Sequence, residues 1–356
     1  MMEEKKVTIL LTVFNRVEFT KKWLNFANNI NLKFKILLCD GGIDNELPQL
    51  IKKKAYPNLN IKYFKAKYYE NYKNFWEKFY QSLNLIDTDY TYLVEDDDFI
   101  VPSNIIKSLN FLENNKDYVS SGGIETHMQI LKGNNKIFFL RPHIKTISYN
   151  QNEAVSRINL SLNTMYSNYN VLHRTRSLLK IFYYLNQKNF INLYITEFVF
   201  VLTSLLNGKC NRFNHIEYIK IDNINHSSSS DFAKKFKFSK IIETKEYENE
   251  NNFIFEILNK ESTFSKQNLK DVRINVKNYL ENDKIYRLNE EAIQKDKFNF
   301  RKLVKKIIGI NNYNILKKYF VKIFKYTLIN ELVFSQYEYK LNQAEVKLIK
   351  KIYEIY

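Results

Sequence analysis

Cysteine, glycine and proline are scarce in this chain of 356 residues, which contains two, seven and four of them respectively. Cys39 and Cys210 are too few for a disulfide framework or a cysteine metal site, which fits a reducing compartment. The N-terminal MMEEKK lacks the apolar stretch of a signal peptide, and no later run is apolar and uncharged for long enough to span a bilayer. We therefore expect a cytoplasmic protein without a membrane-spanning helix.

The few turn-forming residues are unevenly distributed along the chain. All four prolines and five of the seven glycines precede residue 145, so tight turns belong to the N-terminal part and the remainder is predicted to be mostly helical. A hydrophobic content of 45% excludes a disordered protein. The net charge of +17 indicates an anionic partner, which is a nucleotide, a lipid surface or nucleic acid.

Buried-strand patterns alternate with helical patterns in the first part of the chain. Residues 7–13 (VTILLTV) are apolar without alternation, as in a strand covered on both faces, and residues 34–39, 61–64 and 90–94 continue the series. Helical patterns separate these runs. The sequence therefore predicts an α/β fold with a mainly parallel sheet whose loops gather at one edge.

Four adjacent carboxylates follow the fourth of these strands. Glu95, Asp96, Asp97 and Asp98 would repel one another at the carboxyl end of a strand unless a cation lay among them. Mg²⁺ or Mn²⁺ is the natural candidate, because both ions prefer oxygen ligands. The alternative is a solvated acidic turn before the next helix.

The first two strands also end in polar residues that suit a nucleotide diphosphate. Thr12 and Arg16 follow the first strand, and Arg16 can face a phosphate. Asp40 can accept from a ribose hydroxyl or a base N–H, and Gly41 allows the backbone to approach a ligand closely. The alternative for this Asp-Gly-Gly stretch is an ordinary turn.

Three motifs together resemble a known family. TVFNR at residues 12–16, CDGG at 39–42 and YLVEDDDFIVP at 92–102 are similar to the nucleotide-binding half of family 2-type glycosyltransferases with a GT-A fold. The resemblance covers roughly residues 7–230 and extends to a subgroup that builds bacterial surface polysaccharides such as capsule or lipooligosaccharide. It implies a Rossmann-like sheet flanked by helices, and Mn²⁺ or Mg²⁺ on the donor diphosphate.

The resemblance also implies roles for individual residues. Contacts with the nucleoside come from Thr12, Phe14, Arg16 and Asp40, and metal ligands come from Asp96, Asp97 and Asp98. Glu95 takes the first position of the usual Asp-x-Asp-Asp pattern, which leaves open which of the three aspartates touch the metal. Gly41 and Asp96 are expected to contact the donor as well.

Four further residues are candidates for donor or metal binding. His226 lies in a polar stretch at a point where a histidine of related enzymes joins the metal or diphosphate, and a surface loop is the alternative. His173 and Arg174 could bind the donor sugar or diphosphate, or serve ordinary packing. Lys78, in the helix before the acidic strand, is a candidate phosphate contact.

The catalytic base is assigned from the same resemblance. Thr196 and Glu197 open a predicted helix that ends at Gly208, eleven residues after Glu197, and in the resembled family an acidic residue at this point is the base. Glu197 is therefore expected to take the acceptor proton in an inverting reaction. The alternative is a first-turn glutamate favoured by the helix dipole, with Thr196 as N-cap.

We divide the chain into a catalytic domain at 1–230, a linker or helical segment at 231–298, and a basic amphipathic helical region at 299–356. Residues 243–252 are interpreted as a polar, low-complexity joint. Two basic helical patterns near 300–308 and 315–325 suit an anionic membrane surface and a lipid-linked acceptor, or else pack on the catalytic domain. The near-heptad spacing of the last helix, 341–355, is typical of self-association, which would make a homo-oligomer.

The sequence thus favours a glycosyltransferase at the inner face of a bacterial membrane, using a UDP- or GDP-linked sugar and a glycan acceptor. A rival hypothesis is a non-catalytic protein that binds anions or membrane and keeps a degenerate acidic site. Nucleic acid is not expected as a partner, because no recognised DNA- or RNA-binding motif accompanies the charge. A nucleotidyltransferase would require a glycine- and lysine-rich phosphate loop, which TVFNR is not.

Overall fold

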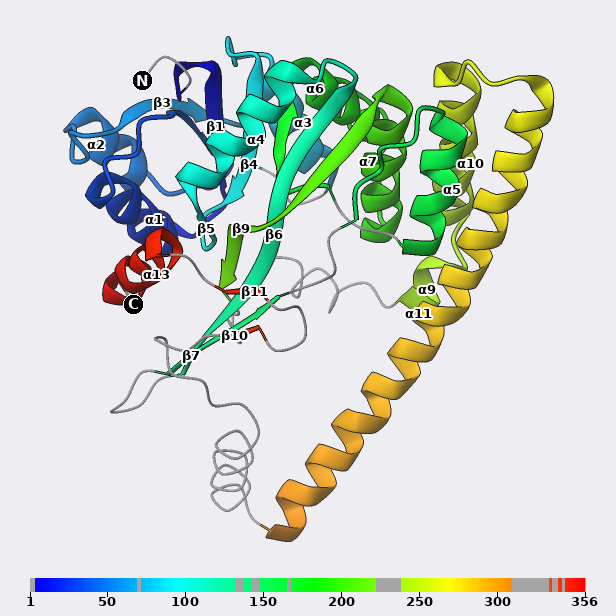
Figure 1. Cartoon of the computed structure of the whole chain (residues 1–356). Helices are drawn as coiled ribbons and strands as arrows, with labels where there is room; N and C mark the ends of the chain where they lie inside the picture. The colour runs from blue at the N-terminus through cyan, green and yellow to red at the C-terminus, as the bar shows by residue number, and fades with distance from the viewer. Residues whose placement is uncertain are drawn as a thin grey trace.

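The buried strands assemble into one central sheet, seen in Figure 1 in a computed structural model. The structure describes residues 4–68, 72–131, 137–142, 147–164, 168–221, 238–308, 333–334, 339–340 and 343–355. The strands are β1 (Val7–Val13), β2 (Lys35–Asp40), β3 (Asn60–Lys65), β4 (Tyr90–Glu95), β5 (Phe99–Ile100), β6 (Tyr118–Leu131), β7 (Ile137–Pro142), β8 (Leu172–Arg174) and β9 (Lys209–Ile221). Their order is β3-β2-β1-β4-β8-β6-β9-β5, with β7 beside β6. The strands β10 (Val333–Phe334) and β11 (Tyr339–Lys340) form a separate pair.

The predicted α/β architecture is confirmed, and its parallel part is the N-terminal half of the sheet. The pairs β1–β2, β1–β4 and β2–β3 are all parallel, as is β6–β9. The strands β5, β7 and β8 pair antiparallel with their neighbours, so the sheet as a whole is mixed. Strand β1 is apolar on both faces because helices cover both faces of the sheet.

The helices form one layer on each side of the sheet. One layer contains α1 (Val17–Asn29), α2 (Glu46–Lys52), α4 (Pro102–Asn114) and α13 (Gln343–Ile355). The other contains α3 (Tyr72–Leu83), α5 (Ala154–Thr164), α6 (Thr175–Leu185), α7 (Leu193–Asn207), α10 (Lys245–Glu261) and α11 (Lys266–Ile308). A short 3-10 turn, η1 (Glu4–Lys6), precedes β1, and the short helix α9 (Phe238–Ile241) precedes α10.

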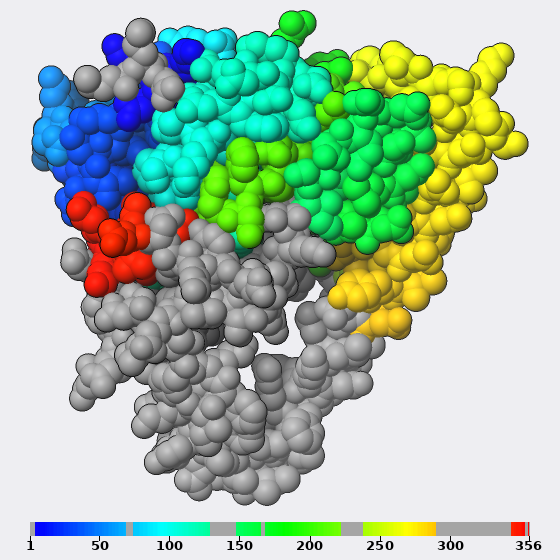
Figure 2. Space-filling view, viewed as in Figure 1, coloured from blue at the N-terminus to red at the C-terminus, as the bar shows by residue number. Residues whose placement is uncertain are grey.

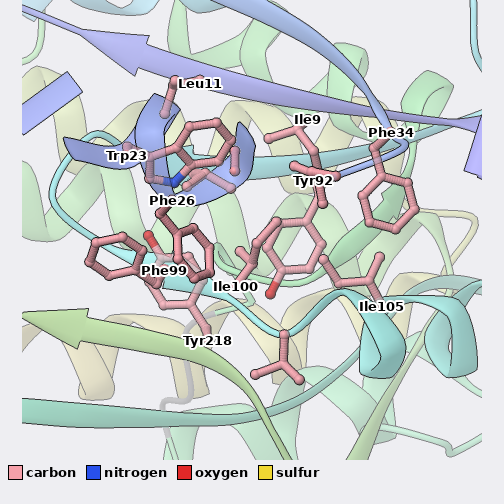
Figure 3. Packing of buried hydrophobic residues seen from close by; sticks show 14 of the residues in the cluster. Ile9, Leu11, Trp23, Phe26, Phe34, Tyr92, Phe99, Ile100, Ile105 and Tyr218 are labelled. Atoms are coloured by element: carbon pink, nitrogen blue, oxygen red, sulfur yellow. The ribbon is translucent and has the colours of Figure 1, made fainter. Parts of the chain in front are cut away.

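The core beneath α1 fixes that helix against the sheet. Trp23 and Phe26 of α1 are fully buried, and the Phe26 ring meets the edge of Phe99 of β5 at a centroid distance of 4.8 Å (Figure 3). Tyr92 of β4 and Tyr218 of β9 stack in the same cluster. Burial of each such ring stabilises the fold by roughly 1.5–3 kcal/mol, so the start of α1 has a fixed position relative to β4 and β5.

The interpretation of residues 243–252 as a polar joint is wrong, because most of this stretch forms the first two turns of α10. Thr244 is its N-cap and accepts from the Tyr247 N–H at 3.3 Å. Glu250 is 3% exposed and accepts from the Ile191 N–H at 2.5 Å, which is why a charged residue is tolerated on the buried face. Burial raises the pKa of Glu250 to about 7. The helices α10 and α11 share the apolar core of α7.

The basic C-terminal stretches are only partly covered by the description. The long helix α11 continues to Ile308 and includes the backbone of the first basic stretch (Figure 1). The second stretch, at 315–325, lies outside the described residues. Among the residues that are described, no helix combines the length and apolarity that crossing a membrane requires. Membrane binding by this region, and the domain limits at 230 and 298, stay predictions.

The last helix packs on the N-terminal part of the chain, where red α13 borders blue α1 in Figure 2. Ile349 and Ile352 are fully buried in the core beneath α1. Glu345, 1% exposed, accepts from the Asn104 side-chain amide of α4 at 3.2 Å. Of the apolar stripe that predicts self-association, Ile352 is buried within the chain, Leu348 and Ile355 pack against the same core, and Leu341 lies outside the described residues. A homo-oligomer stays a prediction.

The packing of α13 can be tested by truncating one buried side chain. We expect Ile352→Ala to lower the free energy of unfolding by about 2–4 kcal/mol, because the cavity left in this core cannot fully collapse. The exposed Lys350 on the same helix provides the control, and Lys350→Ala should change stability by no more than about 0.5 kcal/mol. Urea denaturation at two protein concentrations gives both values. A midpoint that depends on protein concentration would favour self-association through α13 instead.

Candidate active site

The parallel strands place three polar loops side by side at one edge of the sheet. Strand β1 pairs with β2 on one side and with β4 on the other, so Thr12 lies in register between Cys39 and Glu95. The chain order reverses direction at this point, and open α/β sheets bind ligands outside the carboxyl ends of strands at such a switch point. The loops after β1, β2 and β4 therefore meet where the sequence predicts the nucleotide.

Arg16 ties the first loop to the acidic loop. Its guanidinium lies 3.2 Å from Asp96 Oδ1 and 2.5 Å from Asp97 Oδ2, and it stacks over the Phe19 ring at 4.4 Å from the centroid. Although burial opposes the charge, the carboxylates of Asp96 and Asp97 raise the pKa of Arg16. The ion pairs hold both loops in one arrangement.

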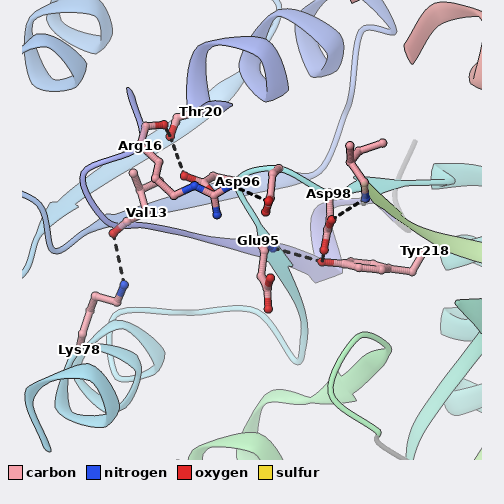
Figure 4. A network of polar contacts seen from close by, with 10 residues as sticks. Val13, Arg16, Thr20, Lys78, Glu95, Asp96, Asp98 and Tyr218 are labelled. Atoms are coloured by element: carbon pink, nitrogen blue, oxygen red, sulfur yellow. Dashed lines mark hydrogen bonds and ion pairs between the residues drawn. The ribbon is translucent and has the colours of Figure 1, made fainter. Parts of the chain in front are cut away.

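Asp96 faces α1 and not the other carboxylates. Its Oδ1 pairs with Arg16, and its Oδ2 accepts from the Thr20 hydroxyl at 3.3 Å (Figure 4). Burial raises the pKa of Asp96 to about 8, while Arg16 works in the opposite direction. The sequence predicts contacts of Asp96 with donor and metal, but its partners in the structure are those of a residue that anchors α1.

Three other carboxylates come together instead. One oxygen each from Glu95, Asp97 and Asp98 lies within 4.8 Å of the others, and no second such group occurs among the described residues. The turn is closed by the Asp98 N–H, which donates to the Glu95 carbonyl at 3.3 Å. This turn directs the first, third and fourth side chains to one side and the second to the other. We call these three residues the acidic trio.

The trio suits a small divalent cation. Oxygen ligands of octahedral Mg²⁺ stand about 3–4 Å apart, so a small closure of the observed spacing would allow two or three of these oxygens to share one ion. Asp98 is held in place by the Tyr218 hydroxyl and the Ile221 N–H, both at 3.0 Å (Figure 4). Burial and the neighbouring Asp97 and Glu95 raise the pKa of Asp98 well above its usual range, a pressure that a bound cation would relieve.

Asp40 lies at the end of β2 with both carboxylate oxygens occupied. Oδ1 accepts from the Gly42 N–H at 2.7 Å, and Oδ2 accepts from the Tyr63 hydroxyl at 2.7 Å and from Lys65 Nζ at 2.9 Å. A Cβ on Gly42 would meet Asn15 Oδ1 at 2.7 Å, so the turn requires glycine there. Oδ2 thus already accepts two hydrogen bonds, whereas Oδ1 accepts one and can take a second donor.

The remaining residues of the first two loops surround this position. The half-buried Phe14 stacks with the exposed Tyr68 at a centroid distance of 5.6 Å. The Gly41 N–H donates to the Val13 carbonyl at 3.1 Å, which closes the β2 turn against β1. Thr12 is half-buried beside them. These residues lie together at the carboxyl ends of β1 and β2, and their contact with a nucleoside stays a prediction.

Lys78 lies beneath the loop that follows β1. It is 2% exposed in α3, and its Nζ donates to the Val13 carbonyl at 3.3 Å, as Figure 4 shows. Burial lowers the pKa of Lys78. The ammonium supports the end of β1 from below, and a phosphate could reach it only after the loop moves. The geometry does not favour the predicted phosphate contact.

His173 and Arg174 belong to the opposite end of the sheet. Strand β8 pairs with the amino end of β4, where Arg174 lies opposite Tyr90, roughly 16 Å along the strand from Glu95. His173 is fully buried with Nε2 2.7 Å from the Asn168 carbonyl. The Arg174 guanidinium donates to backbone carbonyls at the end of α4 and the start of β6, including those of Leu112 and Tyr118. Both side chains bond to backbone carbonyls within the fold, so we do not include them in the proposed donor site.

Glu197 lies in the second turn of α7 and not at its start. The helix begins at Leu193 with Asn192 as N-cap, which accepts from the Tyr194 N–H at 3.1 Å, so Thr196 does not cap it. The Glu197 side chain is exposed, yet the protein packed around its carboxylate raises its pKa, while Arg287 and Lys220 lower it.

Lys220 connects Glu197 electrostatically with the trio. The carboxylates of Glu95 and Asp98 act on the same ammonium of β9. The charge of Lys220 thus acts to lower the pKa of Glu197, of Glu95 and of Asp98, against the effect of burial on each. His226, the remaining predicted metal ligand, lies outside the described residues.

Sequence reasoning missed several residues of this site. Tyr218 and Lys220 reach the acidic loop only because β9 pairs with β5, a strand of two residues with no pattern of its own. Thr20 belongs to a helical stretch that gives no reason to single out one hydroxyl. Tyr63 and Lys65 project from an edge strand. None of them carries a spacing signal toward its carboxylate partner.

Comparison with known proteins finds only remote similarity. No protein-family model matches the chain, and no curated protein matches it. Among solved structures, S. aureus TarS is similar with 16% identity and a TM-score of 0.39, over 74% of this chain and 44% of the TarS chain. TarS 1–349 in complex with UDP-GlcNAc is similar with 15% identity and a TM-score of 0.42, over 74% of each chain. This chain thus spans less than half the length of the longer TarS chain.

The buried state of His173 predicts a specific pH dependence of stability. Burial lowers its pKa from 6.5 to about 4, so between these values the unfolded chain binds more protons than the folded chain. Stability is therefore lost as the pH falls through this window, by roughly 2 kcal/mol between pH 7.5 and pH 5. Glutamine cannot titrate, so the loss of unfolding free energy between pH 7.5 and pH 5 should be smaller by this amount in His173→Gln than in the wild type. Urea unfolding at the two pH values measures the difference.

Parallel curves for the wild type and His173→Gln would contradict the assignment of His173 to the core.

Proposed function

We propose that this protein is a glycosyltransferase that moves a sugar from a UDP- or GDP-linked donor to a hydroxyl of a glycan acceptor. The observation that carries the proposal is the acidic trio of Glu95, Asp97 and Asp98, at the carboxyl end of β4 beside the β1/β4 switch point. A diphosphate bound with a divalent cation fits this position in charge and in place. The loops of Arg16 and Asp40 lie next to it and suit the nucleoside.

The proposed roles follow from the partners of each side chain. Glu95, Asp97 and Asp98 would hold Mn²⁺ or Mg²⁺, and when bound the ion would act as a Lewis acid on the departing diphosphate. Arg16 is 17% exposed and can exchange the Asp97 carboxylate for a phosphate oxygen once the cation takes over Asp97. Asp96 keeps the guanidinium in place during this exchange.

Glu197 is the proposed general base. Its carboxylate takes the proton of the acceptor hydroxyl while the acceptor oxygen forms a bond to the anomeric carbon. The bond from that carbon to the diphosphate oxygen breaks, and the nucleoside diphosphate leaves with the electron pair. A base on the acceptor side predicts inversion of the anomeric configuration. The raised pKa of Glu197 supports this role, because a base works best when its pKa approaches the working pH.

A non-catalytic anion-binding protein is the alternative. The observation that favours it is that Arg16 pairs with Asp97 and so neutralises part of the charge of the trio. The two functions differ in what Glu197 does, since only a transferase needs a base at that position.

Two substitutions separate binding from transfer. Asp98→Asn should abolish Mn²⁺-dependent donor binding, because it removes one carboxylate of the trio. Glu197→Gln should retain donor binding and reduce transfer by about 10²–10⁴-fold, because only the proton acceptor is lost. Donor binding is measured as the rise in melting temperature with nucleoside mono- and diphosphates, with and without Mn²⁺. A ligand at a hundred times its dissociation constant stabilises the wild type by about 2.7 kcal/mol.

The control is Glu256→Gln, which removes an exposed carboxylate from α10 and should leave binding and transfer unchanged. Full transfer by both test variants on the native acceptor would refute the site assignment. Absence of a shift with any nucleotide, CMP included, would favour the non-catalytic alternative.

The acceptor is proposed to be lipid-linked, in surface polysaccharide synthesis at the inner face of a bacterial membrane. The lysine-rich sequence at 315–325 supports this proposal through its charge. Because α13 packs on α1, a test has to leave residues 343–355 in place.

Neutralising four lysines of this stretch tests membrane binding without a deletion. Replacing Lys317, Lys318, Lys322 and Lys325 by glutamine should release the protein from anionic liposomes, since each basic residue near the lipid contributes about 1 kcal/mol. Co-sedimentation with vesicles measures the effect. The matched control replaces four exposed lysines elsewhere, namely Lys52, Lys53, Lys54 and Lys67. If both variants bind vesicles as the wild type does, the alternative that this region packs on the catalytic domain is favoured.

A further inference from the structure

Strand β9 brings a lysine to the edge of the acidic trio. Strands β5 and β9 pair antiparallel with Phe99 opposite Ile219, so one step further along this register Lys220 lies opposite Asp98. The neighbouring Ile221 N–H donates to Asp98, which holds the two segments together. Residues directly opposite in an antiparallel pair project to the same face. The Lys220 side chain therefore shares a face with Asp98.

A glutamate of the next strand holds this lysine. The Lys220 ammonium lies 3.2 Å from Glu125 Oε1, and the two side chains are 33% and 17% exposed. Glu125 is itself oriented by the Asn170 amide, which donates to Oε2 at 3.2 Å, and by His127, whose ring nitrogen lies 3.6 Å away. The glutamate thus has a fixed position from which it can restrain the ammonium.

The lysine is therefore shared between two groups of carboxylates. Glu125 attracts it from the side of β6, and Glu95 and Asp98 attract it from the acidic loop. A divalent cation in the trio would compete with Lys220 for the same two carboxylates and would repel it. The position of the ammonium then affects how easily the cation binds.

We propose that the Glu125–Lys220 ion pair sets the affinity of the trio for a divalent cation, with Glu125 holding the lysine back from Glu95 and Asp98. This inference rests on the proposed metal site. Both residues are positioning residues, because they act on the cation through charge and not as its ligands. Opposite substitutions in the pair should then have opposite effects.

Mn²⁺ titration of the full chain by calorimetry tests the proposal. Lys220→Met should tighten Mn²⁺ binding roughly five- to tenfold, because a divalent ion and a nearby ammonium repel appreciably even in a water-like dielectric. Glu125→Gln should weaken binding by a similar factor, since the released lysine moves onto the trio. In the double variant the effect of Glu125→Gln should be clearly smaller than in the wild type, because only the direct charge of Glu125 near Glu95 remains to be lost.

Two further variants show that charge is responsible. Lys220→Arg keeps the charge and should bind Mn²⁺ as the wild type does, and Lys107→Met removes an exposed charge from α4 and should have no effect. Thermal unfolding confirms that each variant is folded.

The outcomes distinguish this proposal from the proposed function. A wild type that binds no Mn²⁺ would refute both the metal site and the ion pair's role. Wild-type binding that Lys220→Met leaves unchanged or weakens would refute the inference alone. A Glu125→Gln effect of equal size with and without Lys220 would also refute it, because Glu125 would then act directly on the cation.

Discussion

The acidic loop after β4 keeps its conformation because basic side chains offset the repulsion among its carboxylates. Oxygens of Glu95, Asp97 and Asp98 within 4.8 Å of one another destabilise the fold unless positive charge lies close by. Arg16 supplies it from the first loop and Lys220 from β9, on two sides of the loop. The arrangement of the acidic trio therefore depends on two residues outside it.

The hydrophobic core determines the positions of these two charged side chains, Arg16 and Lys220. Trp23 and Phe26 fix α1, and the start of α1 carries Arg16, while the stacked Tyr92 and Tyr218 lie where β9 approaches β4. A displacement of α1 would separate Arg16 from its carboxylates, and α13 packs against the same core. Packing and site electrostatics are thus coupled, since loss of either leaves the buried charges without partners.

How far a single sequence predicts this protein depends on whether a feature is local. The strands at 7–13 and 90–95 and the acidic loop between strand and helix carry their own pattern, which was enough for the fold and for placing the acidic loop at the carboxyl end of a central strand. The direction of Asp96 was not predictable, because it follows from a backbone turn and from partners about eighty residues away. His173 is a similar case, since nothing near it in sequence indicates that β8 joins the amino end of β4. The helix at 245–261 was missed because its buried Glu250 looks polar until its backbone partner is known.

The second helical layer has a chemical consequence as well as a structural one. Protein packed near the exposed Glu197 side chain raises the pKa of its carboxylate, while Arg287 of α11 and Lys220 of β9 favour its charged form. The Arg287 guanidinium lies over the Tyr194 ring, 3.1 Å from its centroid, and Tyr194 precedes Glu197 by about one turn of α7. A base needs both influences, because desolvation increases its affinity for the acceptor proton and the cations keep it ionised before the proton arrives. The helices after residue 230 therefore contribute to the proposed chemistry through the environment of a residue on α7, which explains why a catalytic unit would need more of the chain than its nucleotide-binding half.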